Sequence, residues 1–266
     1  MGITDQRTYP VAGGAMVLAA ALALSACGGG SGESSGAPSS DVAAFCEAIV
    51  AIDSSTDQPE VDFATASEEE IKAAFQEFGR RFEPRIAEVE RTAPDEVKDD
   101  VATQARLARQ GFSSGDEAVF ESPEFTEADA RVDQYMLDNC GYGQIETVAS
   151  DYQFEGIPES IGGGPVAVML KNEGEELHEI VLLRINDDVT LSAEELLALP
   201  EEEAMTKAMP AGFGFAEIGK SSTSFIRLEP GRYLVACFIP VGSKAGQEGD
   251  GPPHFTQGMS AELNVT

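Results

Sequence analysis

The chain of 266 residues contains only two histidines and four cysteines, and both histidines lie after residue 150 together with one cysteine, Cys237. His178 and Cys237 fall in two strand-like segments, and His254 follows in a loop with Met259 five positions later. Two imidazoles, one thiolate and a weak thioether are the donor set of blue-copper electron-transfer sites. This donor set suits copper in both oxidation states, so these residues predict a copper site.

The N-terminus has the features of a secretion signal. The apolar run Ala15–Leu24 is shorter than the roughly 20 residues that a membrane-spanning helix needs. It ends in Leu24-Ser25-Ala26-Cys27, which resembles a bacterial lipobox, so residues 1–26 are predicted to be a signal peptide and Cys27 to be lipidated. An ordinary cleavage site followed by an incidental cysteine is the alternative. Residues 27–40, rich in Gly and Ser, are predicted to form a flexible tether.

Three cysteines remain once Cys27 carries lipid, so they cannot all be paired within the chain. Thiols outside the cytoplasm tend to be oxidised, so an unpaired one needs an explanation. Cys46 and Cys140 lie at the two ends of one helical region, and a disulfide between them would close a loop of more than 90 residues. Such a disulfide contributes about 4–5 kcal/mol in the chain-entropy model. Cys237 is then left buried and inert, paired between molecules, or bound to a metal.

Residues 41–148 are predicted to form a small antiparallel helical bundle. Apolar residues recur at helical spacing from Val42 to Val50, which indicates the first helix. The segment Ser67–Glu70 resembles a capping box that opens a second helix. Pro84 predicts a break or kink in this second helix, because proline lacks the N–H that the preceding turn needs. Two further helices are expected over residues 94–111 and 126–139.

From Asp151 the pattern changes to short strand-like segments that are bounded by turn residues. These segments cover residues 166–170, 177–185, 224–228, 232–239 and 260–266. A helical insert rich in Leu, Glu and Ala is expected over residues 191–207. Several short strands at irregular spacing suggest a β-sandwich. The predicted fold class is therefore multidomain, with a helical bundle (41–148) followed by a sandwich (151–266).

The predicted sandwich resembles a cupredoxin domain of the plastocyanin/azurin type. Three segments carry the resemblance: Asn172–Ile180, Gly231–Pro240 and Gly251–Met259. In that family the first histidine ligand follows an Asn-x-Gly turn and the cysteine ends the penultimate strand. The second histidine and the methionine precede the last strand.

The resemblance implies an eight-stranded Greek-key sandwich with one copper ion at its end. It assigns His178, Cys237 and His254 as equatorial ligands and Met259 as the axial ligand. One departure is the loop of sixteen residues, Phe238–Pro253, between Cys237 and His254, which is longer than in many cupredoxins. A loop rich in Gly and Pro can bulge outward and still return His254 to the metal. A sandwich that holds no copper is the alternative.

The remaining features restrict the partners and the chemistry. The formal net charge of -30 disfavours nucleic acid and anionic lipid, and it favours basic partners or cations, although it also serves solubility. Met205 and Met209 could hold Cu(I), but such a pair more often fills an apolar gap. The pattern Gly-x-Ser-x-Gly occurs at residues 32–36 and 111–115, but neither copy follows a predicted strand, so no nucleophile elbow is predicted. Two histidines are too few for a multicopper oxidase centre. No enzymatic activity is expected.

These observations predict a membrane-anchored copper protein on the extracytoplasmic side of the cell membrane, where it carries electrons. Transport of copper ions between partners is a second possible role. The expected partners are the membrane, through the lipid on Cys27, and a redox protein that is basic where it meets the acidic surface. The alternative is a metal-free cell-surface lipoprotein that uses a cupredoxin-like scaffold for interactions.

Overall fold

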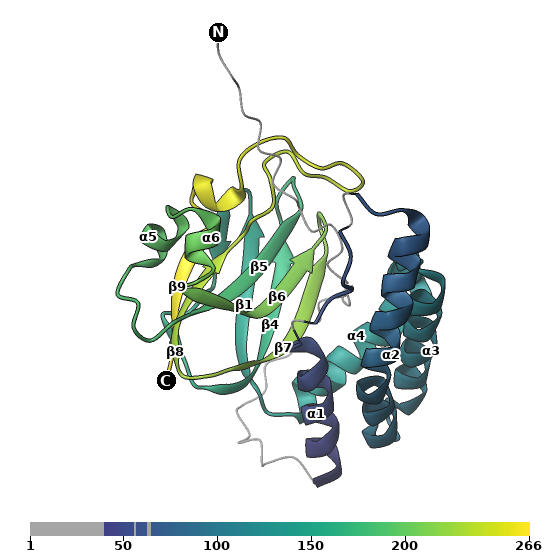
Figure 1. The fold of residues 1–266 in the computed structure, drawn as a ribbon. Coiled ribbons are helices and arrows are strands. Elements are labelled where there is room, and N and C mark those ends of the chain that lie inside the picture. The colour runs from purple at the N-terminus through teal and green to yellow at the C-terminus, as the bar shows by residue number, and fades with distance from the viewer. Residues whose placement is uncertain (1–39, 56, 63–64) are drawn as a thin grey trace.

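The computed structural model of the chain describes residues 40–55, 57–62 and 65–266. The predicted signal peptide and Cys27 lie outside the described residues, as does all but the last residue of the predicted tether. A helical region is followed by a β-sandwich, as predicted (Figure 1). None of the helices in these ranges is long and apolar enough to cross a membrane.

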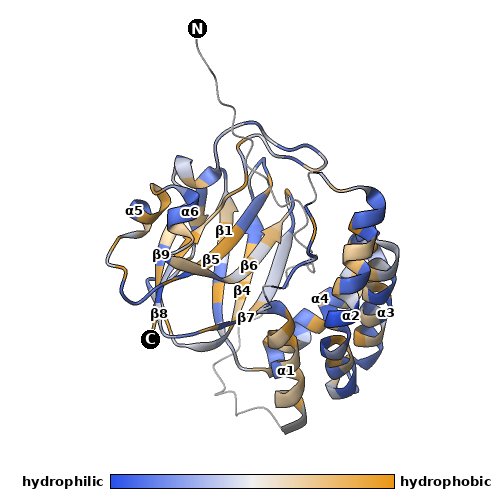
Figure 2. Cartoon of the chain, viewed as in Figure 1, coloured by the Kyte–Doolittle hydropathy of each residue, from blue (hydrophilic) through white to orange (hydrophobic). Residues whose placement is uncertain are grey.

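The helical region combines long helices with one short 3-10 helix. Its elements are α1 (Ser40–Asp53), α2 (Glu68–Thr92), α3 (Lys98–Ser114), η1 (Glu117–Glu121) and α4 (Pro123–Asn139). Figure 2 shows α1 as mostly apolar, whereas α2 and α3 carry both polar and apolar faces. The apolar faces of α2, α3, η1 and α4 meet in a cluster with six phenylalanines: Phe75, Phe78, Phe82, Phe112, Phe120 and Phe125.

Helix α2 shows one correct and one wrong prediction. The capping box is confirmed, because the Glu70 N–H donates to the Ser67 hydroxyl and the Ser67 N–H donates to the Glu70 carboxylate. Of the break or kink predicted at Pro84, the break is wrong, because α2 continues through Pro84 to Thr92. The buried side chains of Phe82 and Ile86, on either side of Pro84, hold this part of the helix in the core. Tertiary packing of this kind outweighs a local helix cost of about 3 kcal/mol.

The sandwich contains nine described strands in two sheets, one more than the resemblance implies. The first sheet has the order β2 (Gln153–Glu155), β1 (Gly143–Ser150), β4 (Gly164–Asn172), β7 (Ser221–Leu228). The second has the order β3 (Ser160–Ile161), β9 (Ser260–Val265), β8 (Gly231–Ala236), β5 (His178–Ile185), β6 (Ala208–Ala216). Strand β1 runs parallel to β4, and β3 runs parallel to β9, so both sheets are mixed.

The two sheets share one apolar core. Ile145 and Val168 of the first sheet are buried in the same cluster as Ile180 and Tyr233 of the second. Cys237 and Met259 belong to this cluster as well, and both have 0% exposure. The predicted site therefore lies at the edge of the main core and not on the surface.

The predicted boundary between the two domains lies too late in the chain. Strand β1 begins at Gly143, not near Asp151, and it pairs with β4 from Gly143 to Ala149. Its alternating burial places Ile145, Thr147 and Ala149 inside. The alternation is not apparent in the sequence, because polar Thr147 is buried whereas apolar Val148 is only half-buried.

The helical region does not have a fully separate core either. Phe45 of α1 and Met136 of α4 pack in one buried cluster with Ala167 and Phe225, which belong to the first sheet. The end of α1 also covers the edge strand β7, where Asp53 accepts a hydrogen bond from the Phe225 N–H at 2.9 Å. Edge strands need such cover because their unpaired N–H groups invite pairing with other chains. The helices are therefore attached to the sandwich through shared core and edge contacts.

The predicted helical insert is only partly helical. It contains two short helices, α5 (Ala193–Leu197) and α6 (Glu201–Ala204), separated around Pro200. The sequence after it forms strand β6, which was not predicted, since Pro210, Gly212 and Gly214 are unusual in a strand. The ideal Cβ of residue 212 would lie 2.3 Å from the Ile226 side chain, so the close approach of β7 explains this glycine.

Candidate metal centre

Three of the four predicted ligands converge at one end of the sandwich. The His254 Nδ1 atom lies 3.2 Å from the His178 Nδ1 atom and 3.4 Å from the Cys237 Sγ atom. One ligand atom from each of these residues lies within 4.8 Å of the others. All three side chains have 0% exposure. Residues that are far apart in the sequence are therefore brought to one buried point.

The spacing of these donor atoms fits one metal ion. Metal–nitrogen distances of about 2.0–2.1 Å at a tetrahedral angle place two imidazole nitrogens roughly 3.3 Å apart, which is close to the 3.2 Å between the two Nδ1 atoms. A thiolate at about 2.3 Å from the same ion would lie roughly 3.5 Å from each nitrogen, and the Cys237 Sγ atom lies 3.4 Å from the His254 Nδ1 atom. The donor set and its geometry therefore both fit a single copper site.

The first ligand is positioned by the turn between β4 and β5. The Asn172 side chain donates to the carbonyl groups of Glu176 and Ala216 at 2.8 and 2.9 Å, and it accepts from the Gly174 N–H at 2.9 Å. Asn172 is itself buried, so these bonds also satisfy its polar atoms. The turn therefore delivers His178 at the first residue of β5, as the Asn-x-Gly pattern predicted.

The second histidine is brought back to the site by backbone hydrogen bonds that join the two ends of the long loop, which we call the loop pinch. The His254 N–H donates to the Ile239 carbonyl at 2.9 Å, and the Val241 N–H donates to the Pro252 carbonyl at 3.0 Å. The Phe255 N–H donates to the Cys237 carbonyl at 2.9 Å. The loop bulges beyond this pinch, which confirms that its length does not prevent His254 from reaching Cys237.

Each histidine directs its second ring nitrogen to a carboxylate. The His254 Nε2 atom lies 2.9 Å from the Glu176 Oε2 atom, and the His178 Nε2 atom lies 3.3 Å from the Asp151 Oδ1 atom. A carboxylate accepts a hydrogen bond from Nε2–H and so favours the tautomer with a free lone pair on Nδ1. The two lone pairs then face the same point, where a cation would relieve their repulsion.

Burial dominates the acid–base properties of the centre. It raises the pKa of the Cys237 thiol to about 12, and the charge of Glu179 adds to this rise. Burial also lowers the pKa of His178, and the neighbouring His254 acts in the same direction. The metal-free site therefore contains a protonated thiol and an imidazole that resists protonation, and a bound metal must displace the thiol proton.

Met259 is placed beside these residues, as predicted for the fourth ligand. The Cys237 N–H donates to the Met259 carbonyl at 3.2 Å, and the Met259 side chain is fully buried. Its role as axial ligand remains a prediction. Met205 and Met209, in contrast, are 56% and 59% exposed, and Met209 lies on β6, so they do not form a helical pair.

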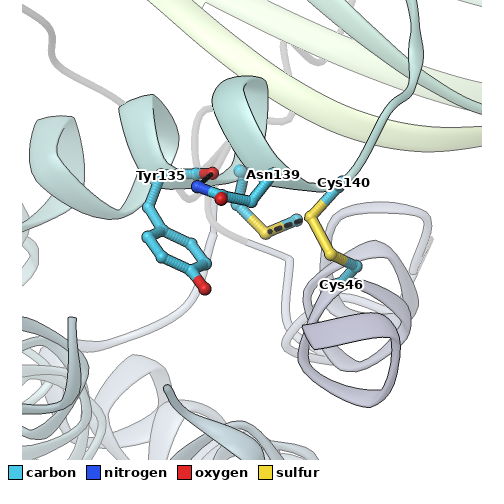
Figure 3. Close-up of a disulfide and its surroundings, with 5 residues drawn as sticks. Cys46, Tyr135, Asn139 and Cys140 are labelled. Atoms are coloured by element: carbon cyan, nitrogen blue, oxygen red, sulfur yellow. Dashed lines mark hydrogen bonds between the residues drawn. A yellow bond between two sulfur atoms is a disulfide. The ribbon is translucent and has the colours of Figure 1, made fainter. Parts of the chain in front are cut away.

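The predicted disulfide is present. Cys46 of α1 and Cys140 at the end of α4 are bonded, with their Cα atoms 5.8 Å apart. Figure 3 shows the bond beside Tyr135 and Asn139, where the Asn139 side-chain amide donates to the Tyr135 carbonyl at 2.8 Å. Cys237 is the one free cysteine among the described residues. The cysteine that the sequence analysis left unpaired is thus the one at the metal centre.

Several residues around the centre were not recognised from the sequence. Glu176 and Asp151 are the carboxylates on the two imidazoles, and the Tyr152 hydroxyl donates to the Glu176 Oε1 atom at 3.1 Å. Tyr152 also packs its ring edge-on against His254, with centroids 5.1 Å apart. It is the one non-glycine residue in the described ranges with a positive φ, at 66°. Such strained positions concentrate at functional sites.

A search of solved structures finds blue copper proteins. An auracyanin from Roseiflexus castenholzii is 20% identical, with 47% of this chain and 99% of that chain covered and a TM-score of 0.31. Auracyanin A from Chloroflexus aurantiacus is 17% identical, with 47% and 100% covered and a TM-score of 0.30. A multicopper oxidase from Pediococcus acidilactici is 11% identical, with 47% and 26% covered and a TM-score of 0.27.

Matches at these identities and TM-scores carry no weight of their own. No protein-family model matches the chain, and no curated protein matches it. The assignment of the centre therefore depends on the donor atoms and on their geometry.

Proposed function

We propose that residues 143–266 form a cupredoxin-type domain that binds one copper ion and transfers electrons through it. The observation that carries this proposal is the buried convergence of His178, Cys237 and His254, with ligand atoms within 4.8 Å of one another. Copper bound there would exchange one electron between two oxidation states. The chain would hold the ligands in nearly the same positions in both states.

The rigidity of the surroundings supports electron transfer. Cys237 follows directly after the last residue of β8, and His178 is the first residue of β5. The two strands are hydrogen-bonded neighbours, with residues 181–184 of β5 paired to β8. The loop pinch and the Asn172 bonds fix the remaining donors. A site held on strands in this way limits the movement that accompanies a change in metal charge. Fully buried donors also leave no open position for a substrate, which is why we propose a carrier and not an enzyme.

We propose that the protein acts at the outer face of a bacterial cell membrane, anchored through lipid on Cys27. The support is the apolar run that ends at Leu24-Ser25-Ala26-Cys27, together with the disulfide, since disulfides persist in oxidising compartments. The formal net charge of -30 favours a basic redox partner and disfavours nucleic acid.

Reversible electron uptake tests the proposed function. The copper-loaded protein should accept one electron per copper from a chemical reductant, lose its visible colour, and recover it fully on reoxidation. Protein film voltammetry should give one reversible couple. A copper site that loses its metal on reduction, or that turns over a phenolic substrate with oxygen, would contradict a carrier function. Retention of zinc in place of copper, without any redox couple, would contradict electron transfer, and failure to bind any metal would favour the metal-free alternative.

A further inference from the structure

Two carboxylates stand behind the metal centre, one on each histidine. Glu176 contacts the Nε2 atom of His254 and Asp151 contacts the Nε2 atom of His178. Their side chains are 14% and 35% exposed, so both are shielded from water to different degrees. The centre therefore has a negatively charged outer layer on both imidazoles.

Both carboxylates are themselves held in place. Glu176 accepts hydrogen bonds from the Gly242 N–H at 2.6 Å and from the Tyr152 hydroxyl at 3.1 Å. Asp151 accepts from the Glu175 N–H at 2.9 Å through the same oxygen that faces His178. Three separate segments thus converge on these two side chains. These hydrogen bonds fix the orientation of both carboxylates, whereas solvated carboxylates on the surface would have no such fixed partners.

We propose that Asp151 and Glu176 are positioning residues that aim both Nδ1 atoms at the metal and favour its oxidised state. This inference rests on the proposed copper function. The carboxylates accept Nε2–H, which fixes the tautomer and raises the basicity of each imidazole. Each carboxylate contacts the ring of a proposed copper ligand, so its negative charge acts on the metal position through that imidazole. Reduction of Cu(II) to Cu(I) by an external one-electron reductant removes one unit of positive charge, so both carboxylates oppose it.

Substitution by the amide separates charge from orientation. In Glu176→Gln the side-chain oxygen still accepts from His254 Nε2–H, but the charge is lost. We expect the affinity for Cu(II) relative to Cu(I) to fall by about tenfold or more, since partners of this kind affect metal sites by about 10–100-fold. A tenfold change raises a one-electron reduction potential by about 59 mV. Asp151→Asn should shift the potential in the same direction.

Glu175→Gln is the matched control. The Glu175 side chain is exposed and neighbours Glu176 in the sequence, so this variant removes an equal charge outside the centre. Its potential should move by less than a third of the Glu176→Gln shift. Equal shifts in Glu175→Gln and Glu176→Gln, or no shift in either site variant, would overturn the proposal. If Glu176→Gln does not fold, Asp151→Asn carries the same comparison.

A second readout needs no copper. In the metal-free protein, nitrogen NMR should show both imidazoles as Nε2–H tautomers, and Glu176→Ala should lose this preference at His254 alone. Nδ1–H tautomers on both rings of the wild-type protein would overturn the proposal. Failure of the wild type to bind copper would count against the proposed function, while this tautomer measurement would still decide on the carboxylate contacts.

Discussion

At the scale of single residues, the centre depends on how closely the backbone allows its parts to approach. Gly174 lies in the turn before His178 and illustrates this. A Cβ at residue 174 would lie 2.4 Å from the Asp151 Oδ1 atom and 2.6 Å from the His178 Nε2 atom. Glycine is therefore required here by the contact between a carboxylate and an imidazole, not by an unusual φ.

The substitution Gly174→Ala should separate Asp151 from His178 and lower copper affinity by about 10–100-fold. Gly162→Ala is the control, since a Cβ at residue 162 would meet nothing within 4 Å. Competition with a copper chelator measures both affinities, and thermal unfolding of the metal-free proteins shows whether the fold is kept. Equal copper affinity in the two variants would show that the Asp151 contact does not matter.

At the scale of elements, the contact between α1, α4 and the first sheet contains buried acid groups. Asp53 of α1 faces Asp129 and Asp133 of α4, together with the N–H of Phe225 on β7. Burial raises the pKa of Asp53 to about 7, and the charge of Asp129 adds to the rise. Burial raises the pKa of Asp133 as well. These groups line a cavity between helices and sheet together with Gln104 and Thr223.

This arrangement predicts a pH-dependent stability. The folded chain keeps the Asp53 proton up to about pH 7, whereas the unfolded chain releases it near the ordinary pKa of 3.8. The free energy of unfolding therefore loses up to about 1.4 kcal/mol per pH unit between these values and loses no more above them. In Asp53→Asn the amide oxygen still accepts the Phe225 N–H without carrying charge. Its stability relative to the wild type should rise from pH 4 to 7 and then level off.

Urea unfolding from pH 4 to 9 measures this difference, with the exposed Asp95→Asn variant as the control. A difference between Asp53→Asn and the wild type that stays constant over the whole range would show that Asp53 is ionised in the folded protein throughout. A decrease with rising pH would mean that the Asp53 carboxylate is stabilised by its surroundings.

The elements also show where sequence patterns are sufficient. The first helix, the capping box of α2 and five strands were predicted because each has a local signal in apolar spacing or turn residues. Strand β6 escaped because Pro210, Gly212 and Gly214 are tolerated only through contacts with β7 and β5 that no local pattern contains. The continuation of α2 through Pro84 likewise depends on tertiary packing.

The residues of the metal centre also fall into those that a sequence pattern identifies and those that only the tertiary structure identifies. His178, Cys237 and His254 were predicted because imidazole and thiol are rare in this chain, and Met259 was predicted because it follows His254 in a known order. Glu176 could have been found as the carboxylate two residues before His178. Asp151 could not, because carboxylates are common in so acidic a chain and the hydrogen bond spans 27 residues.

At the scale of the whole molecule, the proposed anchor depends on a single residue. The folded body carries a strongly negative charge, which anionic lipid repels, so membrane retention should depend on lipid at Cys27. In Cys27→Ala, attachment of radiolabelled fatty acid should be lost, and the cleavage that follows lipidation should fail. The wild type should take up the label and sediment with membranes. Recovery of unlabelled wild-type protein in the medium would make Cys27 part of a simple linker.

The copper centre is the central claim, and a copper titration of the metal-free protein with a reduced Cys237 tests it most directly. One equivalent of Cu(II) should produce an intense visible sulfur-to-copper charge-transfer band. This band should be absent in Cys237→Ala and retained in Met209→Leu, which changes an exposed methionine away from the centre. Failure of the folded wild type to bind one copper ion, or a band of equal strength in Cys237→Ala, would contradict the account.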